Sequence, residues 1–349
     1  MSSPVSPRST VRRGISTLCI AISAFACAPS SISPAAALED VNFLVAAPPT
    51  LPAFGPLVLA KHLGYYADAG YGVHFQIAKG GFDIAVNVGA GNAPFGLSLG
   101  DAPIVVRGRG IPIKTVATLG GGALGALVAR KDRGISKIED LRGKKISVMS
   151  FQEANYYATL AALAARGVEK KDVEIQAVGP AGVTSLVIAG ATDACICTPD
   201  WEINVEDAVG STVAMPLKDY VPTAAQAIVS SDILIAKRPE LVRAIVQATL
   251  GGMKLIMDSP DTAAKTFSEA VPSYADKQDM LKRIFRNYID RTYAGQKILG
   301  ETNHATLAAI EKLYLEQGVA KQAIPIDQFY TNQFISNREN LSDAKDGRR

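Results

Sequence analysis

Apolar and polar residues in the first part of the chain alternate between the period of a strand and that of a helix. The apolar run Val41–Ala47 ends at two prolines and predicts a strand buried on both faces. A helix is expected from Pro56 to about Tyr66, because proline is favoured in a first helical turn. The alternation in Tyr71–Ala78 predicts a second strand. This βαβ unit implies a parallel sheet with ligand-binding loops at its carboxyl edge.

The rest of the chain continues this pattern and becomes helical from Pro239 onward. Strands alternating with helices exclude all-β and all-helical folds and predict an α/β protein. We expect the chain to pass between two lobes near Leu127 and again near Ile233, which makes a hinge. The further strands are expected at Ile113–Thr118, Gly125–Ala129, Lys145–Met149, Val173–Ala177 and Ala191–Thr198, and a short element of unassigned type around Ala93–Ser98. The further helices are expected at Phe82–Ala90, Glu153–Arg166, Val183–Ala189, Glu202–Val209, Pro239–Met257, Asp261–Ala270, Lys277–Tyr288 and Ala305–Gln317.

Three shorter patterns predict local features. Asp101 stands where its carboxylate would cap the helix Ala102–Gly108. Ser136, with Glu139 three residues later, is typical of a capping box. The run Gly120–Gly122 lacks the later spacing of a dinucleotide-binding loop. We therefore expect it to be a flexible segment.

Four segments resemble, in order, the periplasmic solute-binding proteins of nitrate, sulfonate, taurine and thiamine-pyrimidine ABC importers. They are PLVLAKHLGYYADAGYGVHFQIAKGG (Pro56–Gly81), GISKIEDLRGKKISVMS (Gly134–Ser150), VTSLVIAGATDACICTPDW (Val183–Trp201) and ILIAKRPELVRAIVQATLGGMKLI (Ile233–Ile256). The resemblance covers roughly residues 41–330. It implies a two-lobed type II periplasmic binding protein fold, with a ligand cleft between the lobes and two hinge crossings.

Residues 1–37 have the order of a secretory signal peptide. Arg12 and Arg13 precede the apolar stretch Ile15–Ala28, and small residues follow up to Ala37, where cleavage is expected. The apolar stretch is shorter than the roughly 20 residues that span a bilayer. We therefore expect export to the periplasm.

The export route is less clearly marked. Val11 stands where a twin-arginine signal has Ser or Thr, so the Sec route is favoured over Tat. Cys27 is a weak lipoprotein signal, because Ala24 and Phe25 fit the lipidation pattern poorly.

Charge changes the picture once this segment is set aside. Its three arginines account for the net charge of +3, so the remaining chain is formally neutral. A neutral chain without basic runs offers no footprint for nucleic acid or anionic lipid. Its length favours two lobes. We expect lobe one at residues 38–128 and 231–336, lobe two at residues 129–230, and a frayed tail at residues 337–349.

Two of the four cysteines lie outside the predicted signal peptide. Cys195 and Cys197 share one face of an expected strand. This spacing suits a disulfide poorly, and we expect two small buried side chains instead. The three histidines do not have the spacing of a metal site, so no metal or cofactor is expected.

Ligand contacts are expected at the carboxyl ends of strands, where helix N-termini favour anionic groups. By resemblance, the family holds its ligands with the loops Ala47–Phe54, Phe95–Asp101, Ser150–Asn155 and Thr198–Trp201. Lys79–Phe82 also follows a strand, but its glycines can be explained by the turn alone.

The candidate ligand-binding residues are donors, one acceptor and aromatic side chains of these loops. The hydroxyl groups would donate to an anion and Asp200 would accept from an amine, although loop capping or an N-cap of the following helix explains them equally well. The aromatic rings would stack on a flat ligand or belong to the core. The candidates are Thr50, Phe54, Ser98, Ser150, Phe151, Asp200 and Trp201.

Three charged residues near these loops are given other roles. Arg107 and Arg109 are expected to be solvated, because they lie in a glycine-rich turn. Glu153, close to Ser150, argues against a fully anionic ligand such as nitrate.

The resemblance implies the extracytoplasmic solute-binding component of an ABC importer. Such a protein captures a small organic solute, here anionic or aromatic, by hinge closure and delivers it to an ABC permease in the inner membrane. We expect the protein to be a monomer. We do not expect an enzyme, because the chain lacks a G-x-S-x-G elbow and a phosphate-binding loop. Two alternatives stay open: a periplasmic ligand-sensing subunit of a signalling system, and an enzyme similar to the thiamine-pyrimidine synthase.

Overall fold

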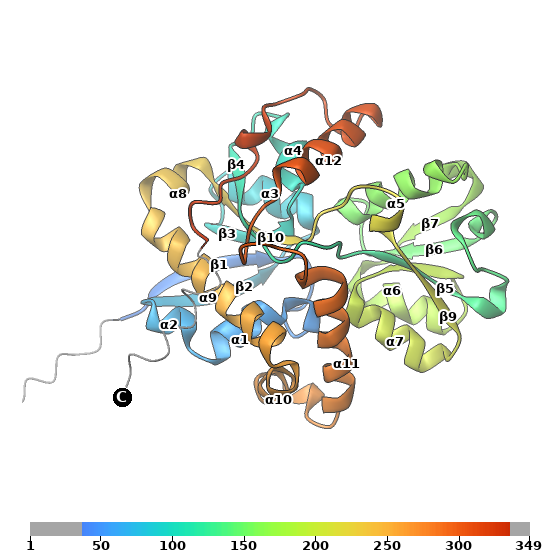
Figure 1. Ribbon diagram of the computed structural model, residues 1–349, viewed down its shortest axis with the longest axis horizontal. Helices are drawn as coiled ribbons and strands as arrows, with labels where there is room; N and C mark the ends of the chain where they lie inside the picture. Colours follow the sequence, from blue (N-terminus) through green and yellow to red (C-terminus); the bar gives the residue numbers. More distant parts are fainter. Residues whose placement is uncertain (1–36, 336–349) are drawn as a thin grey trace, which may run out of the picture. The chain divides into compact units, whose positions relative to one another are not determined.

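Two five-stranded sheets organise residues 37–335, the part of the chain that the computed structural model describes (Figure 1). The predicted signal peptide up to residue 36 and the predicted tail lie outside it. In spatial order, the first sheet contains β2 (Tyr71–Ile77), β1 (Glu39–Val45), β3 (Phe95–Leu99), β10 (Gln226–Ser231) and β4 (Ile113–Thr118). The second contains β7 (Glu174–Ala177), β6 (Lys145–Val148), β8 (Ala194–Cys197), β5 (Ala126–Arg130) and β9 (Thr212–Pro216).

Each sheet with its helices forms one lobe, so the predicted two-lobed α/β class is confirmed. None of the helices described is both long and apolar enough to cross a membrane. Lobe one has α1 (Gly55–His62), α2 (Tyr65–Asp68), α3 (Gly81–Gly89), α4 (Ala102–Arg107), α8 (Asp232–Lys237), α9 (Pro239–Asp258), α10 (Pro260–Ala270), α11 (Gln278–Tyr288) and α12 (His304–Glu316). Lobe two has α5 (Ala154–Ala165), α6 (Gly179–Ile188) and α7 (Pro199–Val209).

The predicted βαβ unit is present at the edge of the first sheet. β1 pairs in parallel with β2 and with β3, whereas β10 runs antiparallel between β3 and β4. The helix expected from Pro56 to Tyr66 is interrupted: α1 ends at His62, and α2 begins at Tyr65 after Gly64, whose φ is 78°. Glycine adopts this left-handed conformation without a steric cost, so it ends the helix here.

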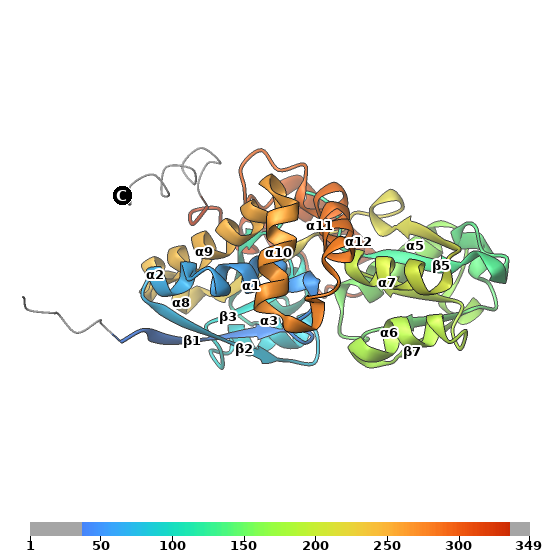
Figure 2. The same ribbon diagram turned by 90° about the horizontal axis from the view of Figure 1, so that it is seen from below.

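Side chains of β1 enter the core on both faces of the sheet, as predicted for this run. Successive residues of a strand point to opposite faces. Phe43 and Val45 therefore join the core under α1, α9 and α10, while Leu44 joins the core formed with α3 and α4. Figure 2 shows α1, α9 and α10 gathered on one face of the first sheet.

The chain crosses between the lobes twice, but at positions that differ from the prediction. It leaves the first sheet after Thr118 and enters the second at Ala126, then returns between Pro216 and Gln226. Leu127 and Ile233, expected at the crossings, lie inside β5 and α8. Apolar residues continue through both elements, so the sequence pattern does not mark where the chain passes from one lobe to the other.

The glycine run in the first crossing is packed against backbone, so the expectation of a flexible segment is wrong. Gly121 and Gly122 donate their N–H groups to Ala294 O at 3.1 Å and Thr292 O at 3.0 Å. A Cβ on Gly120 would lie 1.9 Å from Thr292 O, and one on Gly122 would lie 1.9 Å from Arg291 O. These positions are glycine because two backbones meet there.

Three predicted local features are corrected by the structure. The Asp101 carboxylate does not cap α4; it is buried and accepts a hydrogen bond from the Tyr314 hydroxyl at 2.6 Å. In the expected capping box, Asp140 and not Glu139 accepts from Ser136 N. Asp101 is drawn into tertiary packing instead of capping its own helix. The helical turn Ile138–Leu141 starts later than expected, so the residue that caps it is also later.

The guanidinium group of Arg107 is only partly exposed, so the expectation of a solvated side chain is wrong. It donates to Asp232 at 2.9 Å and to Ile113 O at 2.9 Å. These bonds tie α4 to the start of α8. Arg109 is exposed, as expected.

Candidate ligand-binding site

A pocket lies at the carboxyl ends of strands from both sheets. Lobe one contributes the loop after β1, the end of β3 and the start of α3. Lobe two contributes the segment from β6 into α5 and the segment from β8 into α7. The lining residues are Ala46, Ala47, Leu51, Ala53, Phe54, Gly81, Leu97, Ser98, Leu99, Leu124, Val148, Met149, Ser150, Glu153, Asn155, Tyr156, Ile196, Thr198, Trp201 and Gln226.

Four of the seven candidate residues line this pocket: Phe54, Ser98, Ser150 and Trp201. Three others do not. Thr50 is exposed on the loop after β1. Phe151 is 46 % exposed, with its ring 5.0 Å from that of Tyr156. Asp200 is buried beneath the pocket wall.

Asp200 makes contacts within the protein. Its Oδ1 accepts from the Thr198 hydroxyl at 2.5 Å and from the Tyr288 hydroxyl of α11 at 2.8 Å. Burial raises the pKa of Asp200, and these two hydrogen bonds offset only part of the effect. Thr198 is the N-cap of α7, so Asp200 lies in the first turn and is not itself the N-cap.

The two serines of the pocket differ in what they offer to a ligand. Ser98 is buried and donates its hydroxyl proton to Gly81 O at 2.9 Å. Ser150 Oγ accepts from Gln152 N at 3.0 Å, which leaves the Ser150 proton available to a ligand. Ser150 is therefore the better candidate donor.

Several pocket residues were missed or given another role in the sequence analysis. Asn155 and Thr198 line the pocket and lie inside two of the loops expected to bind the ligand. Their position in these loops could therefore have marked them as ligand-binding candidates. Gln226 lies in β10, where no pattern marks it. Its Oε1 is buried without a hydrogen-bond partner among the described residues.

Glu153 is the carboxyl side chain among the described residues that line the pocket. Its Oε1 accepts from Gly81 N of lobe one at 2.8 Å. Desolvation raises the pKa of Glu153 to about 7, the hydrogen bond from Gly81 lowers it, and the nearby Asp101 raises it further. The lining residues described include no Lys, Arg or His, so a bound anion would find no cationic side chain here.

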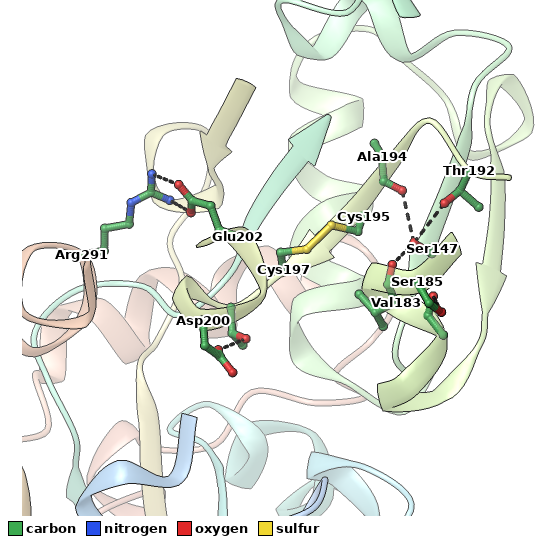
Figure 3. The surroundings of a disulfide bond; sticks show 12 residues. Ser147, Val183, Ser185, Thr192, Ala194, Cys195, Cys197, Asp200, Glu202 and Arg291 are labelled. Atoms are coloured by element: carbon green, nitrogen blue, oxygen red, sulfur yellow. Dashed lines mark hydrogen bonds and ion pairs between the residues drawn. A yellow bond between two sulfur atoms is a disulfide. The ribbon is translucent and has the colours of Figure 1, made fainter. Parts of the chain in front are cut away.

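Cys195 and Cys197 are buried on β8, as expected. They form a disulfide, however (Figure 3), so the expectation that they are not bonded to each other is wrong. Their Cα atoms are 5.6 Å apart, within the usual range for a disulfide. Residues two apart on a strand point to one face, about 6.6 Å apart when fully extended. Slight contraction therefore suffices, and the bond fixes the strand beside the lining residues Ile196 and Thr198.

Within residues 37–335, no group of three or more His, Cys, Asp or Glu side chains is placed to hold a metal ion. The sulfur atoms of Cys195 and Cys197 are bonded to each other. The described pocket therefore offers hydrogen-bonding and aromatic groups rather than a set of metal ligands.

The chain is similar in sequence to one protein family and to relatives of known name. Residues 51–263 match the protein family described as NMT1/THI5 like. The chain is 26 % identical over 333 residues to the riboflavin-binding protein RibY of Chloroflexus aurantiacus, covering 88 % of this chain and 93 % of the relative. It is 21 % identical over 299 residues to the 4-amino-5-hydroxymethyl-2-methylpyrimidine phosphate synthase of Legionella pneumophila, covering 82 % and 89 %.

The fold is shared with solved binding proteins. The alkanesulfonate-binding protein SsuA from Xanthomonas axonopodis, bound to MOPS, superposes with a TM-score of 0.66 at 14 % identity. The superposition covers 85 % of this chain and 99 % of that protein. The fold is thus the two-lobed periplasmic binding protein fold expected from the resemblance.

Proposed function

The chain belongs to the NMT1/THI5-like family, and from this premise we propose that it is the extracytoplasmic solute-binding component of an ABC importer. The observation that carries the proposal is the pocket itself, which is lined from both lobes. A ligand between the lobes favours the closed form through contacts that improve on closure. The closed monomer then docks on a permease in the inner membrane.

The proposed ligand is a small aromatic solute. Phe54, Tyr156 and Trp201 offer ring faces beside apolar walls, and a few polar groups can orient the ligand. The described residues that line the pocket include no Lys, Arg or His, which disfavours an anionic ligand, one of the two kinds of solute that we expected. The Chloroflexus relative is named for binding riboflavin, a flat heteroaromatic compound, so riboflavin is the first compound to test.

The single tryptophan of the chain makes the test direct, because Trp201 lines the pocket. We expect riboflavin to quench its fluorescence with a dissociation constant near or below about 1 µM and to raise the melting temperature. Trp201→Phe should remove the fluorescence signal while calorimetry still detects binding. MOPS is the comparison ligand.

The proposal fails if riboflavin, pyrimidines, aromatic acids and sulfonates all leave both the fluorescence and the melting temperature unchanged. Binding without import would favour the sensing alternative. Deleting the permease gene distinguishes the two roles. Loss of growth on the ligand supports the importer component, and unchanged growth supports the sensing subunit.

A second candidate is a pyrimidine-phosphate-forming enzyme, favoured by the name of the Legionella relative. The sulfur atoms of Cys195 and Cys197 form a disulfide, so these two residues are not available as thiolate ligands for iron. Release of the pyrimidine phosphate by protein supplied with iron would support the enzyme, and its absence alongside riboflavin binding would support the solute-binding role.

A further inference from the structure

The two lobes meet across the pocket at the N-terminus of α3. We call this contact the clasp; it is formed by Gly80–Phe82 of lobe one and Gln152–Glu153 of lobe two. Glu153 Oε1 accepts from Gly81 N at 2.8 Å, and Gln152 O accepts from Phe82 N at 3.3 Å. The N-cap residue Gly80 has no side chain to cap the helix, so lobe two supplies the acceptors.

The clasp fits closely. Gly80 has a φ of 150°, and a Cβ there would lie 2.9 Å from both Glu153 Oε1 and Gln152 O. A Cβ on Gly81 would lie 2.8 Å from Ser98 Oγ. Gly80 therefore allows the two lobes to approach each other here, and Gly81 allows the start of α3 to lie against Ser98 of the same lobe.

The clasp places a carboxyl group where an anion would otherwise bind. Amides at a helix N-terminus, with the positive end of the helix dipole, favour anionic groups. Here Glu153 already accepts from the Gly81 amide, and Asp83 in the first turn accepts from Lys79 N at 3.0 Å. A ligand anion approaching this end of α3 would find the Gly81 amide already occupied by a carboxyl group.

The pocket also contains an acceptor that the protein leaves unused. Gln226 is 7 % exposed and lines the pocket, and its Oε1 has no hydrogen-bond partner among the described residues. Buried polar atoms are nearly always hydrogen-bonded in native proteins. A ligand with an N–H or O–H donor would supply the missing bond.

We propose that Glu153 is a specificity-determining residue that occupies the anion position at the N-terminus of α3. With Gln226, it makes the pocket select uncharged, hydrogen-bond-donating aromatic solutes over sulfonates and carboxylates. This inference rests on the proposed solute-binding function and adds the charge and donor pattern of the solute.

The test compares wild type with Glu153→Ala, using riboflavin as the uncharged probe and sulfate and MOPS as anionic probes. Wild type should bind riboflavin and gain no stability from either anion. Glu153→Ala should bind riboflavin about tenfold more weakly, because the clasp is lost, and should become stabilised by sulfate. Asp140→Ala is the matched control, since it removes a carboxylate from backbone amides of lobe two away from the pocket.

Two further variants keep the test decisive if Glu153→Ala folds poorly. Glu153→Gln removes only the charge and should show the same gain of anion binding to a smaller extent. Gln226→Leu should weaken riboflavin binding about tenfold without any gain of anion binding. Circular dichroism verifies that each variant is folded.

The outcomes separate this inference from the proposed function. Strong binding of MOPS or sulfate to wild type overturns the inference, as does riboflavin binding that Glu153→Ala leaves unchanged. If riboflavin, pyrimidines and aromatic acids bind to no variant, the aromatic-solute function fails. A gain of sulfate binding in Glu153→Ala would even then support the role of Glu153 in excluding anions.

Discussion

At the scale of single residues, the most consequential feature is a set of three carboxyl groups: Asp101 and Asp200 are buried, and Glu153 is partly buried. Burial is the largest cause of the raised pKa of Asp101, Glu153 and Asp200. For Asp101 the pKa rises to about 6, although the hydrogen bond from Tyr314 lowers it. These groups therefore hold their protons more tightly in the folded chain than in the unfolded one.

This makes the stability of the protein depend on pH in a predictable direction. The contribution of Asp101 to the free energy of unfolding is fully present below about pH 4 and is lost as the pH rises through about 6. Asp101→Asn should remove this slope, worth at most about 3 kcal/mol, while Asn still accepts from Tyr314.

Urea denaturation between pH 4 and pH 8 measures the slope. Asp276→Asn is the control, because Asp276 is exposed. A slope that is equal in wild type and Asp101→Asn would show that burial of this carboxyl does not matter to stability.

At the scale of elements, the first crossing between the lobes depends on close contact between two backbones. Gly122→Ala would place a methyl group 1.9 Å from Arg291 O. Backbone cannot move aside as a flexible side chain can, so we expect a loss of at least about 2 kcal/mol in the free energy of unfolding. Denaturant unfolding measures it.

Gly108→Ala is the control for this substitution, since its Cβ would meet neighbours no closer than 3.8 Å. Equal stability of the two variants would mean that the crossing tolerates displacement and that the contact is not rigid.

The elements themselves could largely be predicted from the sequence, because each is marked by its own hydrophobic period. Contacts between distant segments could not. The pairing of Asp101 with Tyr314 joins positions 213 residues apart, and nothing near Gly120 predicts the backbone it meets. In the site, the loops were predictable from strand ends, whereas Gln226 was not, because a polar residue within a strand does not reveal which face it occupies.

At the scale of the whole molecule, the lobes are joined by more than the two crossings. α11 and the π-helical turn Ile289–Tyr293 of lobe one lie against α7 of lobe two (Figure 1). Tyr288 donates to the buried Asp200, and Arg291 forms an ion pair with Glu202 at 2.5 Å. This contact therefore links the two lobes at a place outside the two crossings of the chain.

Removing the hydroxyl group of this contact should weaken the coupling between the lobes. Tyr288→Phe leaves Asp200 Oδ1 with Thr198 as its remaining side-chain donor, so we expect a loss of about 1–3 kcal/mol in the free energy of unfolding. Tyr293→Phe is the matched control, because the buried Tyr293 hydroxyl has no hydrogen-bond partner within residues 37–335 and its ring stacks on that of Tyr288. Thermal and urea unfolding of both variants would decide; an equal loss in both would contradict the prediction.

The disulfide has a consequence for the biogenesis of the protein. Cys195 and Cys197 are two residues apart, so the bond can close in an unfolded chain without any distant segment being brought into place. The other two cysteines, Cys19 and Cys27, lie in the predicted signal peptide. If the predicted signal peptide is removed, Cys195 and Cys197 are the two cysteines that remain, so one intramolecular pairing is possible and no isomerase is required to correct it.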